Sequence, residues 1–422
     1  MRSVTFVDKV ELEFEGNLLS NNVILGDINN DGEHELVVGN VEGDLNIFKG
    51  DAVTAWARCS GLGMITCLGI GDLFNKMKNV VVTMNAEGWC NIFQFSSEDK
   101  VGKVCMKPVD MVPCHTQHLA ANTKMILIDD VDGDGMYELV IGHTDRVIRA
   151  YKWMEYSDDN PSEQSKGILK LLQMWEPPGQ IGSIALHHQN GIPKLVASQP
   201  GFCYVELKCT WAEEGNIQAY NENSVLIVAH SISSVKARNS IITTEISGHL
   251  SQGTSVVDEP QCDKFVLSSL DGNLMMIQED EMVWSYKLDH QLFSLTALDI
   301  TGDGKDEVLC CAWNGMTYIA DQEQNIAKFR FDGNVAAFCA GRYTIAGATN
   351  PCLVYATFDN KIYVYYNVKL PRIDSVNLLD LLPSTSEYLD LLKDHEINQS
   401  DKETQANCIR KVLYGCDSIS TT

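Results

Sequence analysis

The sequence is poor in basic residues and contains no long apolar run. Among its 422 residues, 32 are Lys or Arg and 57 are Asp or Glu, which gives a formal net charge of −25. Such a charge repels nucleic-acid phosphates and anionic lipids at long range, so the sequence argues against nucleic acid as a partner. No stretch approaches the roughly 18 to 20 consecutive apolar residues of a membrane span, and charged residues interrupt the first positions, where a signal peptide is apolar. We therefore expect a soluble, intracellular protein without direct membrane insertion.

Cysteine spacings typical of zinc centres and the motifs of common enzymes are also missing. The 14 cysteines include no Cys-x-x-Cys pair, and they support neither a zinc site nor a disulfide framework. Most of them, such as Cys310 and Cys311 in an apolar run, are expected to be buried thiols. The sequence has no Gly-x-Ser-x-Gly elbow, no Walker loop and no His-Glu-x-x-His motif, so it predicts a protein that is not an enzyme.

One unit is repeated seven times along most of the chain. Each copy has a short apolar run, a turn-rich or acidic loop, a second apolar run, a tight turn and a third run of alternating β-forming residues. The second runs begin at Glu35, Asn79, Glu138, Lys194, Lys264, Glu307 and Cys352. Their spacing, from 43 residues between Lys264 and Glu307 to 70 residues between Lys194 and Lys264, fits four-stranded blades. We therefore predict an all-β fold, a seven-bladed β-propeller over residues 1–368.

The two ends of this repeat region are predicted to pair with each other. The seventh copy supplies three strands, near residues 335–339, 352–358 and 361–368, and no fourth. Residues 4–14 read as a strand that precedes the first copy, so we expect them to complete the last blade and close the ring. The longest interval between copies, about residues 209–260, is predicted to be partly an excursion from the ring.

The last part of the chain, residues 369–422, is predicted to be a helical tail. Capping boxes begin at Ser384 and Ser400, and each opens a short amphipathic segment. Two roles for these helices remain open, which are docking on the propeller and binding a partner.

Three copies carry an acidic loop in one common frame between their first and second runs. Oxygen-bearing side chains stand at positions 1, 3, 5 and 9, Gly stands at position 6, and the backbone carbonyl of position 7 is a further oxygen. This spacing is typical of loops that bind calcium, a hard cation that takes about six to eight oxygen ligands. The candidate metal ligands are Asp27, Asn29, Asp31, Glu33 and Glu35 in the first copy, Asp130, Asp132, Asp134, Met136 and Glu138 in the third, and Asp299, Thr301, Asp303, Lys305 and Glu307 in the sixth.

Two interpretations of these loops remain open. In the first they hold structural calcium in up to three places, most tightly in the third copy, which has a carboxylate at each of positions 1, 3, 5 and 9. In the second they are turns held by hydrogen bonds from Asp and Asn side chains, without metal. The second copy has Phe74 and Lys76 where oxygens are needed, so we do not expect it to bind metal in this way. In both interpretations the loops brace the blades.

The seven-fold pattern with these loops resembles the FG-GAP repeats of the integrin α-subunit propeller. The Phe-Gly and Gly-Ala-Pro pairs are absent, and position 9 is Glu where integrins favour Asp. As a whole, the chain is more similar to an intracellular FG-GAP family whose members are subunits of the KICSTOR complex. The segments that carry this likeness are GDINNDGEHELVVGN from Gly26 and DDVDGDGMYELVIGHTDRVIRAYKW from Asp129.

The resemblance implies a non-enzymatic scaffold that acts through other proteins. It implies kaptin, the other KICSTOR subunits and the GATOR complex as partners, and a cytoplasmic location that is peripheral at the lysosomal membrane through the complex. It further implies that the protein helps to inhibit mTOR signalling when amino acids or glucose are short. An alternative from another class is a carbohydrate-binding propeller, either a lectin or a glycan hydrolase.

Overall fold

A computed structural model describes residues 2–95, 108–156, 167–189, 191–213, 226–231, 242–251, 264–278, 281–370, 404–407, 409 and 410. The chain divides into two compact units, Met1–Leu370 and Pro371–Thr422. In the second unit the described residues are helical and fall within the second predicted helix, whereas the first predicted helix lies outside the described residues. Within the described part of the chain, no helix is long and apolar enough to cross a membrane.

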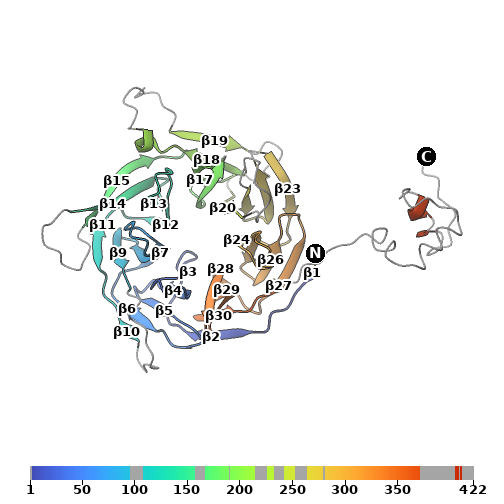
Figure 1. The fold of residues 1–422 in the computed structure, drawn as a ribbon, viewed down its shortest axis with the longest axis horizontal. Coiled ribbons are helices and arrows are strands. Elements are labelled where there is room, and N and C mark those ends of the chain that lie inside the picture. The colour runs from blue at the N-terminus through green and yellow to red at the C-terminus, as the bar shows by residue number, and fades with distance from the viewer. Residues whose placement is uncertain are drawn as a thin grey trace. The chain divides into compact units, whose positions relative to one another are not determined.

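The first unit is a ring of seven blades in the part of the chain that the structure describes (Figure 1). This arrangement confirms the predicted all-β, seven-bladed propeller. Blade one consists of β3 (Val23–Gly26), β4 (Glu35–Gly39), β5 (Leu45–Phe48) and β6 (Ala57–Cys59), and blade two of β7 (Ile65–Gly71), β8 (Val80–Asn85), β9 (Trp89–Phe93) and β11 (His115–His118). Blade three consists of β12 (Thr123–Asp129), β13 (Glu138–His143), β14 (Ile148–Glu155) and β15 (Gly167–Trp175), and blade four of β16 (Ile184–Gln189), β17 (Ile192–Gln199), β18 (Cys203–Leu207) and β19 (Ile227–Ser231).

The remaining blades continue the same antiparallel order around the ring. Blade five consists of β20 (Thr244–Leu250), β21 (Lys264–Ser269), β22 (Asn273–Gln278) and β23 (Glu281–Lys287). Blade six consists of β24 (Leu292–Leu298), β25 (Glu307–Ala312), β26 (Met316–Ala320) and β27 (Ile326–Arg330). Blade seven consists of β28 (Val335–Ile345), β29 (Ala348–Thr357), β30 (Lys361–Tyr365) and β2 (Lys9–Glu13). Two short strands, β1 (Arg2–Ser3) and β10 (Val109–Asp110), pair in parallel with β27 and β6. A 3-10 helix, η1 (Thr210–Glu213), follows β18.

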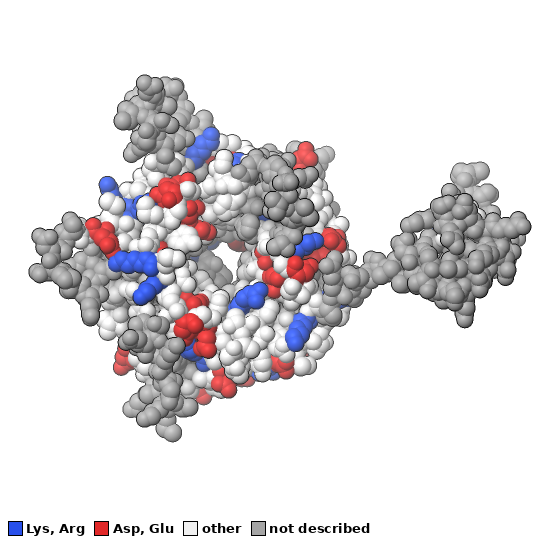
Figure 2. Space-filling view, viewed as in Figure 1, with Lys and Arg blue, Asp and Glu red and all other residues white. Residues whose placement is uncertain are grey.

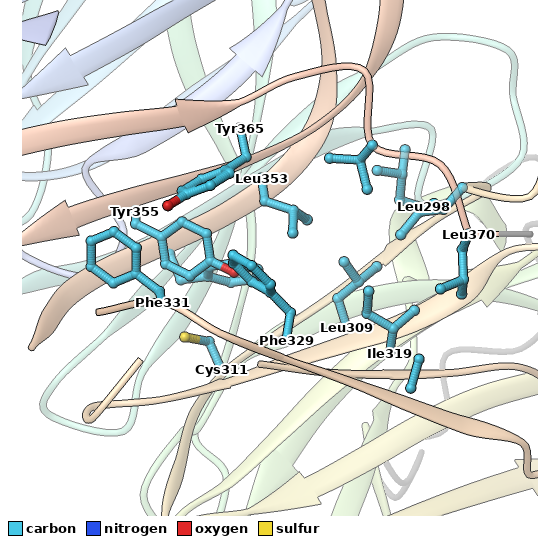
Figure 3. Packing of buried hydrophobic residues seen from close by; sticks show 14 of the residues in the cluster. Leu298, Leu309, Cys311, Ile319, Phe329, Phe331, Leu353, Tyr355, Tyr365 and Leu370 are labelled. Atoms are coloured by element: carbon cyan, nitrogen blue, oxygen red, sulfur yellow. The ribbon is translucent and has the colours of Figure 1, made fainter. Parts of the chain in front are cut away.

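The apolar core lies between neighbouring blades. The second strand of several blades, such as β4, β13 and β25, is buried at every residue, because the blades on either side cover both of its faces. Between blades six and seven the ring of Phe331 stacks on that of Tyr355 with centroids 4.6 Å apart (Figure 3). The buried Tyr355 hydroxyl lies 2.7 Å from Thr317 Oγ1, so its polar atom is satisfied.

Tryptophans tie the outer strand of one blade to the next blade. Trp175, at the end of β15, is 1% exposed, and its Nε1 donates to the carbonyl of Lys208 in blade four at 3.1 Å. Trp284, in β23, donates in the same way to the carbonyl of Gln322 in blade six at 3.1 Å. Both indoles therefore lie between neighbouring blades, whereas Trp56 directly precedes its outer strand, β6.

The ring is closed by β2, which pairs with β30 (Figure 1). The antiparallel register runs from Lys9 opposite Tyr365 to Glu13 opposite Lys361. Leu12 is 2% exposed and belongs to the core between blades seven and one. The strand expected over residues 4–14 is shorter in the structure, where β2 spans Lys9–Glu13 and pairs with blade seven. A separate short strand that precedes it, β1, pairs with blade six. The N-terminal segment therefore holds two neighbouring blades.

The partial excursion predicted over about residues 209–260 stays a prediction. Part of this interval lies outside the described residues, but the described parts belong to the ring. β19 is the outer strand of blade four, and β20 is the innermost strand of blade five. Ser198 Oγ in blade four donates to the carbonyl of Thr244 at 2.6 Å, which joins the two blades. Its described parts supply the fourth strand of blade four and the first strand of blade five, so they do not contain the continuous apolar run that marks a second strand.

A truncation tests ring closure. Deleting residues 1–15 removes β2 and leaves the edge of β30 unpaired, so we expect the truncated chain to aggregate and to melt at a lower temperature. Size-exclusion chromatography with light scattering and a thermal melt measure both effects. Deleting only residues 1–7 removes β1 but keeps β2, so this control should remain monomeric. A monomeric 1–15 deletion with an unchanged melting temperature would show that β2 does not close the ring.

Candidate metal loops and the joints between blades

The three acidic loops join the first and second strands of blades one, three and six. They run between β3 and β4, between β12 and β13, and between β24 and β25. Because the same connection of each blade lies on the same side of a propeller, the loops share one face of the ring. On the face seen in Figure 2, acidic side chains gather in separate groups around the ring, with basic side chains beside several of them. Because the three loops belong to different blades, the predicted ligands form three separate clusters, one in each of these blades.

Position 1 of each loop organises the turn. Asp27, Asp130 and Asp299 each accept a hydrogen bond from the amide of the position 6 glycine, at 3.0, 2.8 and 3.0 Å. These glycines have φ between 82° and 85°, in the left-handed region where a side chain is strained. The position 5 aspartates in turn accept from the amides of position 7, which belong to Glu33, Met136 and Lys305. The loops thus contain the hydrogen-bonded turn of the metal-free interpretation.

The position 9 glutamate is the buried end of each loop. Glu35 and Glu138 are fully buried and Glu307 is 3% exposed. Each accepts a hydrogen bond from the position 2 amide, at 3.2, 3.3 and 2.8 Å in this order. Burial raises the pKa of all three carboxyl groups, and for Glu138 burial together with the nearby Asp132 raises the pKa to about 7. A buried carboxylate of this kind needs a positive charge or several donors beside it.

In blade one, Lys49 supplies that charge. Its Nζ lies 2.7 Å from Asp31 Oδ2, 2.8 Å from Glu35 Oε1 and 3.3 Å from Glu33 Oε2. Burial of the ammonium favours its neutral form, but the hydrogen bonds with Asp31 and Glu35 outweigh this effect and raise the pKa of Lys49. This lysine lies outside the loop sequence and is not among the predicted ligands.

Blade three has the same arrangement with Lys152. Its Nζ lies 2.6 Å from Asp134 Oδ2 and 3.1 Å from Glu138 Oε1. A third carboxylate, Asp132, accepts a hydrogen bond at 2.7 Å from the indole Nε1 of Trp211, which lies in η1. This loop, which has a carboxylate at each of positions 1, 3, 5 and 9, therefore contacts both a lysine of its own blade and a tryptophan that follows β18 of blade four.

Blade six differs at the corresponding position. The strand register places Val308 opposite Ala320, so the next residue, Asp321, stands opposite Glu307. Asp321 accepts hydrogen bonds from the amides of Glu323 and Asn325 in its own turn, at 2.9 and 2.7 Å. Thr301, the third loop position, donates its hydroxyl to Glu307 Oε1 at 3.0 Å.

These arrangements test the fit of the loops to calcium. In blade three, carboxylate oxygens of Asp130, Asp132 and Glu138 lie within 4.8 Å of one another, the one such group found among the described residues. Their chemistry suits a hard cation. However, Lys152 already contacts Glu138, and Trp211 already contacts Asp132. The loops of blades one and three therefore do not fit a divalent cation while their lysines are in place, and calcium in the blade six loop stays a prediction.

Position 8 of the loops joins neighbouring blades, a role that the sequence analysis does not predict. In blade one, the amide of His34 donates to Thr344 Oγ1 of blade seven at 2.8 Å, and the amide of Thr344 donates to the carbonyl of His34 at 3.1 Å. In blade six, the amide of Asp306 donates to the carbonyl of Ser251 of blade five at 3.0 Å. The amide of Ser251 donates back to Asp306 Oδ2 at 2.7 Å. Each joint is thus a reciprocal pair.

Asparagines at position 4 make the corresponding joints between blades one, two and three. Asn30 Oδ1 accepts from the amide of Asn79 at 2.7 Å, and Asn75 Oδ1 accepts from the amide of Tyr137 at 2.6 Å. The φ angles of Asn30 and Asn75 are 61° and 55°, a left-handed conformation that Asn tolerates better than most residues. These joints could have been predicted from the sequence, because Asn stands at position 4 in two consecutive copies. The loop of blade two, which lacks metal ligands, still makes a joint.

Comparison with known proteins identifies the family. The sequence matches the family described as Integrin-alpha FG-GAP repeat-containing protein 2 over residues 49–370. The chain belongs to this family. Two curated relatives, from Mus musculus and Bos taurus, are each named KICSTOR complex protein ITFG2 and are each 40% identical to it. The mouse alignment covers 99% of this chain and 97% of the relative, and the bovine alignment covers 90% and 74%.

Solved structures with the same fold are more distant from this FG-GAP protein. BBS1N, solved in complex with ARL6DN, has a TM-score of 0.56 at 12% identity, over 88% of this chain and all of that one. Raptor from Chaetomium thermophilum has a TM-score of 0.55 at 11% identity, over 88% of this chain and 29% of that one. At these identities the likeness shows the fold alone. The family resemblance predicted from the loops is confirmed by the sequence comparisons.

A glycine substitution tests the joints of this FG-GAP protein. Asn30→Gly keeps the left-handed backbone but removes the side chain that bonds to blade two, so we expect a loss of about 1 to 2 kcal/mol in the free energy of unfolding. Asn122→Gly is the matched control, because Asn122 has a φ of 63° and is exposed. Chemical denaturation of both variants measures the difference. Equal losses in the two variants would mean that the joint does not stabilise the ring.

Proposed function

We propose that the chain is a non-enzymatic scaffold subunit of the KICSTOR complex. The observation that carries the proposal is its 40% identity, over 99% of its length, with a mouse protein named KICSTOR complex protein. An alignment of this extent includes every blade and the C-terminal unit, so it is not limited to the shared propeller fold. The distant propellers contribute nothing to this proposal, because their identity is far lower.

The geometry of the acidic loops supports a structural role for their charged groups. Asp130 is engaged by three amides of its own loop, and Glu138 is engaged by an amide and an ammonium. A general acid or base must be free to exchange a proton with a substrate. In the described loops of blades one and three, the carboxylates instead hold the turn. This supports a scaffold more than a hydrolase.

The partners proposed are those of the resembling family. They are kaptin, the other KICSTOR subunits and the GATOR complex, which the complex would hold at the lysosomal membrane. A rigid ring of seven blades presents a wide rim to several proteins at once, and the net charge of −25 favours partner surfaces that are basic. Through this assembly the protein would help shortage of amino acids or glucose to inhibit mTOR signalling.

The C-terminal unit is the element that we expect to contact a partner. It forms a compact unit of its own, Pro371–Thr422, and the first unit ends at Leu370. The partner-binding interpretation of its helices therefore predicts that the ring alone folds but assembles poorly.

Affinity purification from cells tests this function. The tagged full chain should recover kaptin and other KICSTOR subunits, and a chain of residues 1–370 should recover fewer of them at an unchanged melting temperature. As a control, Asp132→Ala with Asp134→Ala should lower the melting temperature and reduce recovery only in proportion to the folded protein. Cells that lack the protein should keep mTOR signalling active on amino-acid withdrawal. Normal shutdown in those cells would contradict the proposal, and specific retention on a glycan array would favour the carbohydrate-binding alternative.

A further inference from the structure

We propose that in blades one and three a lysine ammonium takes the place of a divalent cation, so that these two loops are built to work without calcium. The proposal concerns Lys49 and Lys152 and does not depend on the proposed function. It replaces the metal interpretation for two of the three acidic loops.

The two lysines occupy the same position in blades that lie far apart in the sequence. The register places Leu36 opposite Phe48, so Lys49 stands opposite the position 9 glutamate, Glu35. In blade three, Leu139 lies opposite Tyr151, so Lys152 stands opposite Glu138. A cross-strand neighbour of this kind is within reach of its partner by the geometry of the sheet alone. The lysine is therefore part of the loop design in both blades, even though it lies outside the loop sequence.

The contacts of the ammonium are those that a small cation would make. Lys49 Nζ has three carboxylate oxygens within 3.3 Å, from Asp31, Glu33 and Glu35, which matches the three donors of an ammonium group. A calcium ion that bound Asp31 and Glu35 at the usual 2.3 to 2.6 Å would lie within about 5 Å of Lys49 Nζ. Two positive charges so close together in a partly buried site repel each other strongly. Lysine and calcium therefore compete for the same oxygens.

The blade three loop has a further donor that a metal site does not need. Asp132, the position 3 ligand in the calcium frame, accepts from the indole of Trp211 at 2.7 Å. Trp175 packs against Trp211 with ring centroids 5.8 Å apart, which fixes the indole in place. With Lys152 on Asp134 and Glu138, three of the four carboxylates of this loop have a side-chain donor from outside the loop.

Blade six provides the internal contrast. The residue opposite its position 9 glutamate is Asp321, which caps its own turn. A lysine therefore stands opposite the position 9 glutamate in the blades whose loops have Asn29 or Asp132 at position 3. In blade six, where position 3 is Thr301, Asp321 stands there instead of a lysine. A response of the protein to calcium through blade six would be the same in any variant of Lys49 or Lys152.

Replacing the lysine should convert a calcium-independent loop into a calcium-dependent one. Lys152→Met keeps most of the apolar stem and removes the charge, which leaves Asp134 and Glu138 without their ammonium. We expect the melting temperature in chelator to fall by roughly 5 °C, because a buried carboxylate loses its partner. Millimolar calcium should restore most of this loss by binding only the folded state. Wild-type protein should show a smaller response to calcium.

The measurement is the difference between the melting temperatures in calcium and in chelator for wild type, Lys152→Met and Lys49→Met. Lys194→Met is the matched control, because Lys194 pairs with Glu206 at 3.2 Å outside the acidic loops. This control should lose stability without gaining a response to calcium. A larger calcium response in both loop variants than in wild type and control supports the proposal. Equal responses in all four proteins would overturn it.

Should Lys152→Met or Lys49→Met fail to fold in chelator, terbium luminescence on protein purified in calcium provides a second test. Terbium bound near the tryptophans of blade three should give a sensitised signal in Lys152→Met and a weaker one in wild type. A wild-type signal as strong as that of the variant would show that the lysine does not exclude the cation, and would overturn the proposal.

Discussion

The pairing of β2 with β30 is the interaction on which the rest of the structure depends. Without a fourth strand, the last blade would leave the edge of β30 unpaired. Here that fourth strand comes from the other end of the chain. The segment also reaches blade six through β1. Every core between blades, including the one around Tyr355, is then covered on both sides. Closure therefore converts seven marginal sheets into one cooperative unit.

Two kinds of contact hold the blades once the ring is closed. Apolar side chains fill the space between sheets, and reciprocal hydrogen bonds join the loops on one face, as between His34 and Thr344. The acidic loops contribute to the second kind through position 8. In blades one and three, the ammonium groups of Lys49 and Lys152 balance the negative charge of the buried position 9 glutamates. The loops are in this sense structural joints first and candidate metal sites second.

The sequence was sufficient to predict the ring because the second strands are buried on both faces and therefore read as continuous apolar runs, such as that from Glu35. It was not sufficient for β20, which lacks this pattern and lies in the longest interval between copies. The members of each loop were predicted because they are neighbours in sequence. Their lysine partners were not predicted, because the register of two strands decides which residues lie opposite each other. The sequence did contain a sign of them, since in both copies a lysine follows the position 9 glutamate at the same distance along the chain.

Hydrogen exchange followed by mass spectrometry on the full chain tests the closed ring most directly. If β2 is the outer strand of the last blade, the amides of residues 9–13 that face β30 exchange slowly, in parallel with those of β30 at residues 361–365. Rapid exchange over residues 9–13, while residues 361–365 remain protected, would contradict closure by the N-terminal strand.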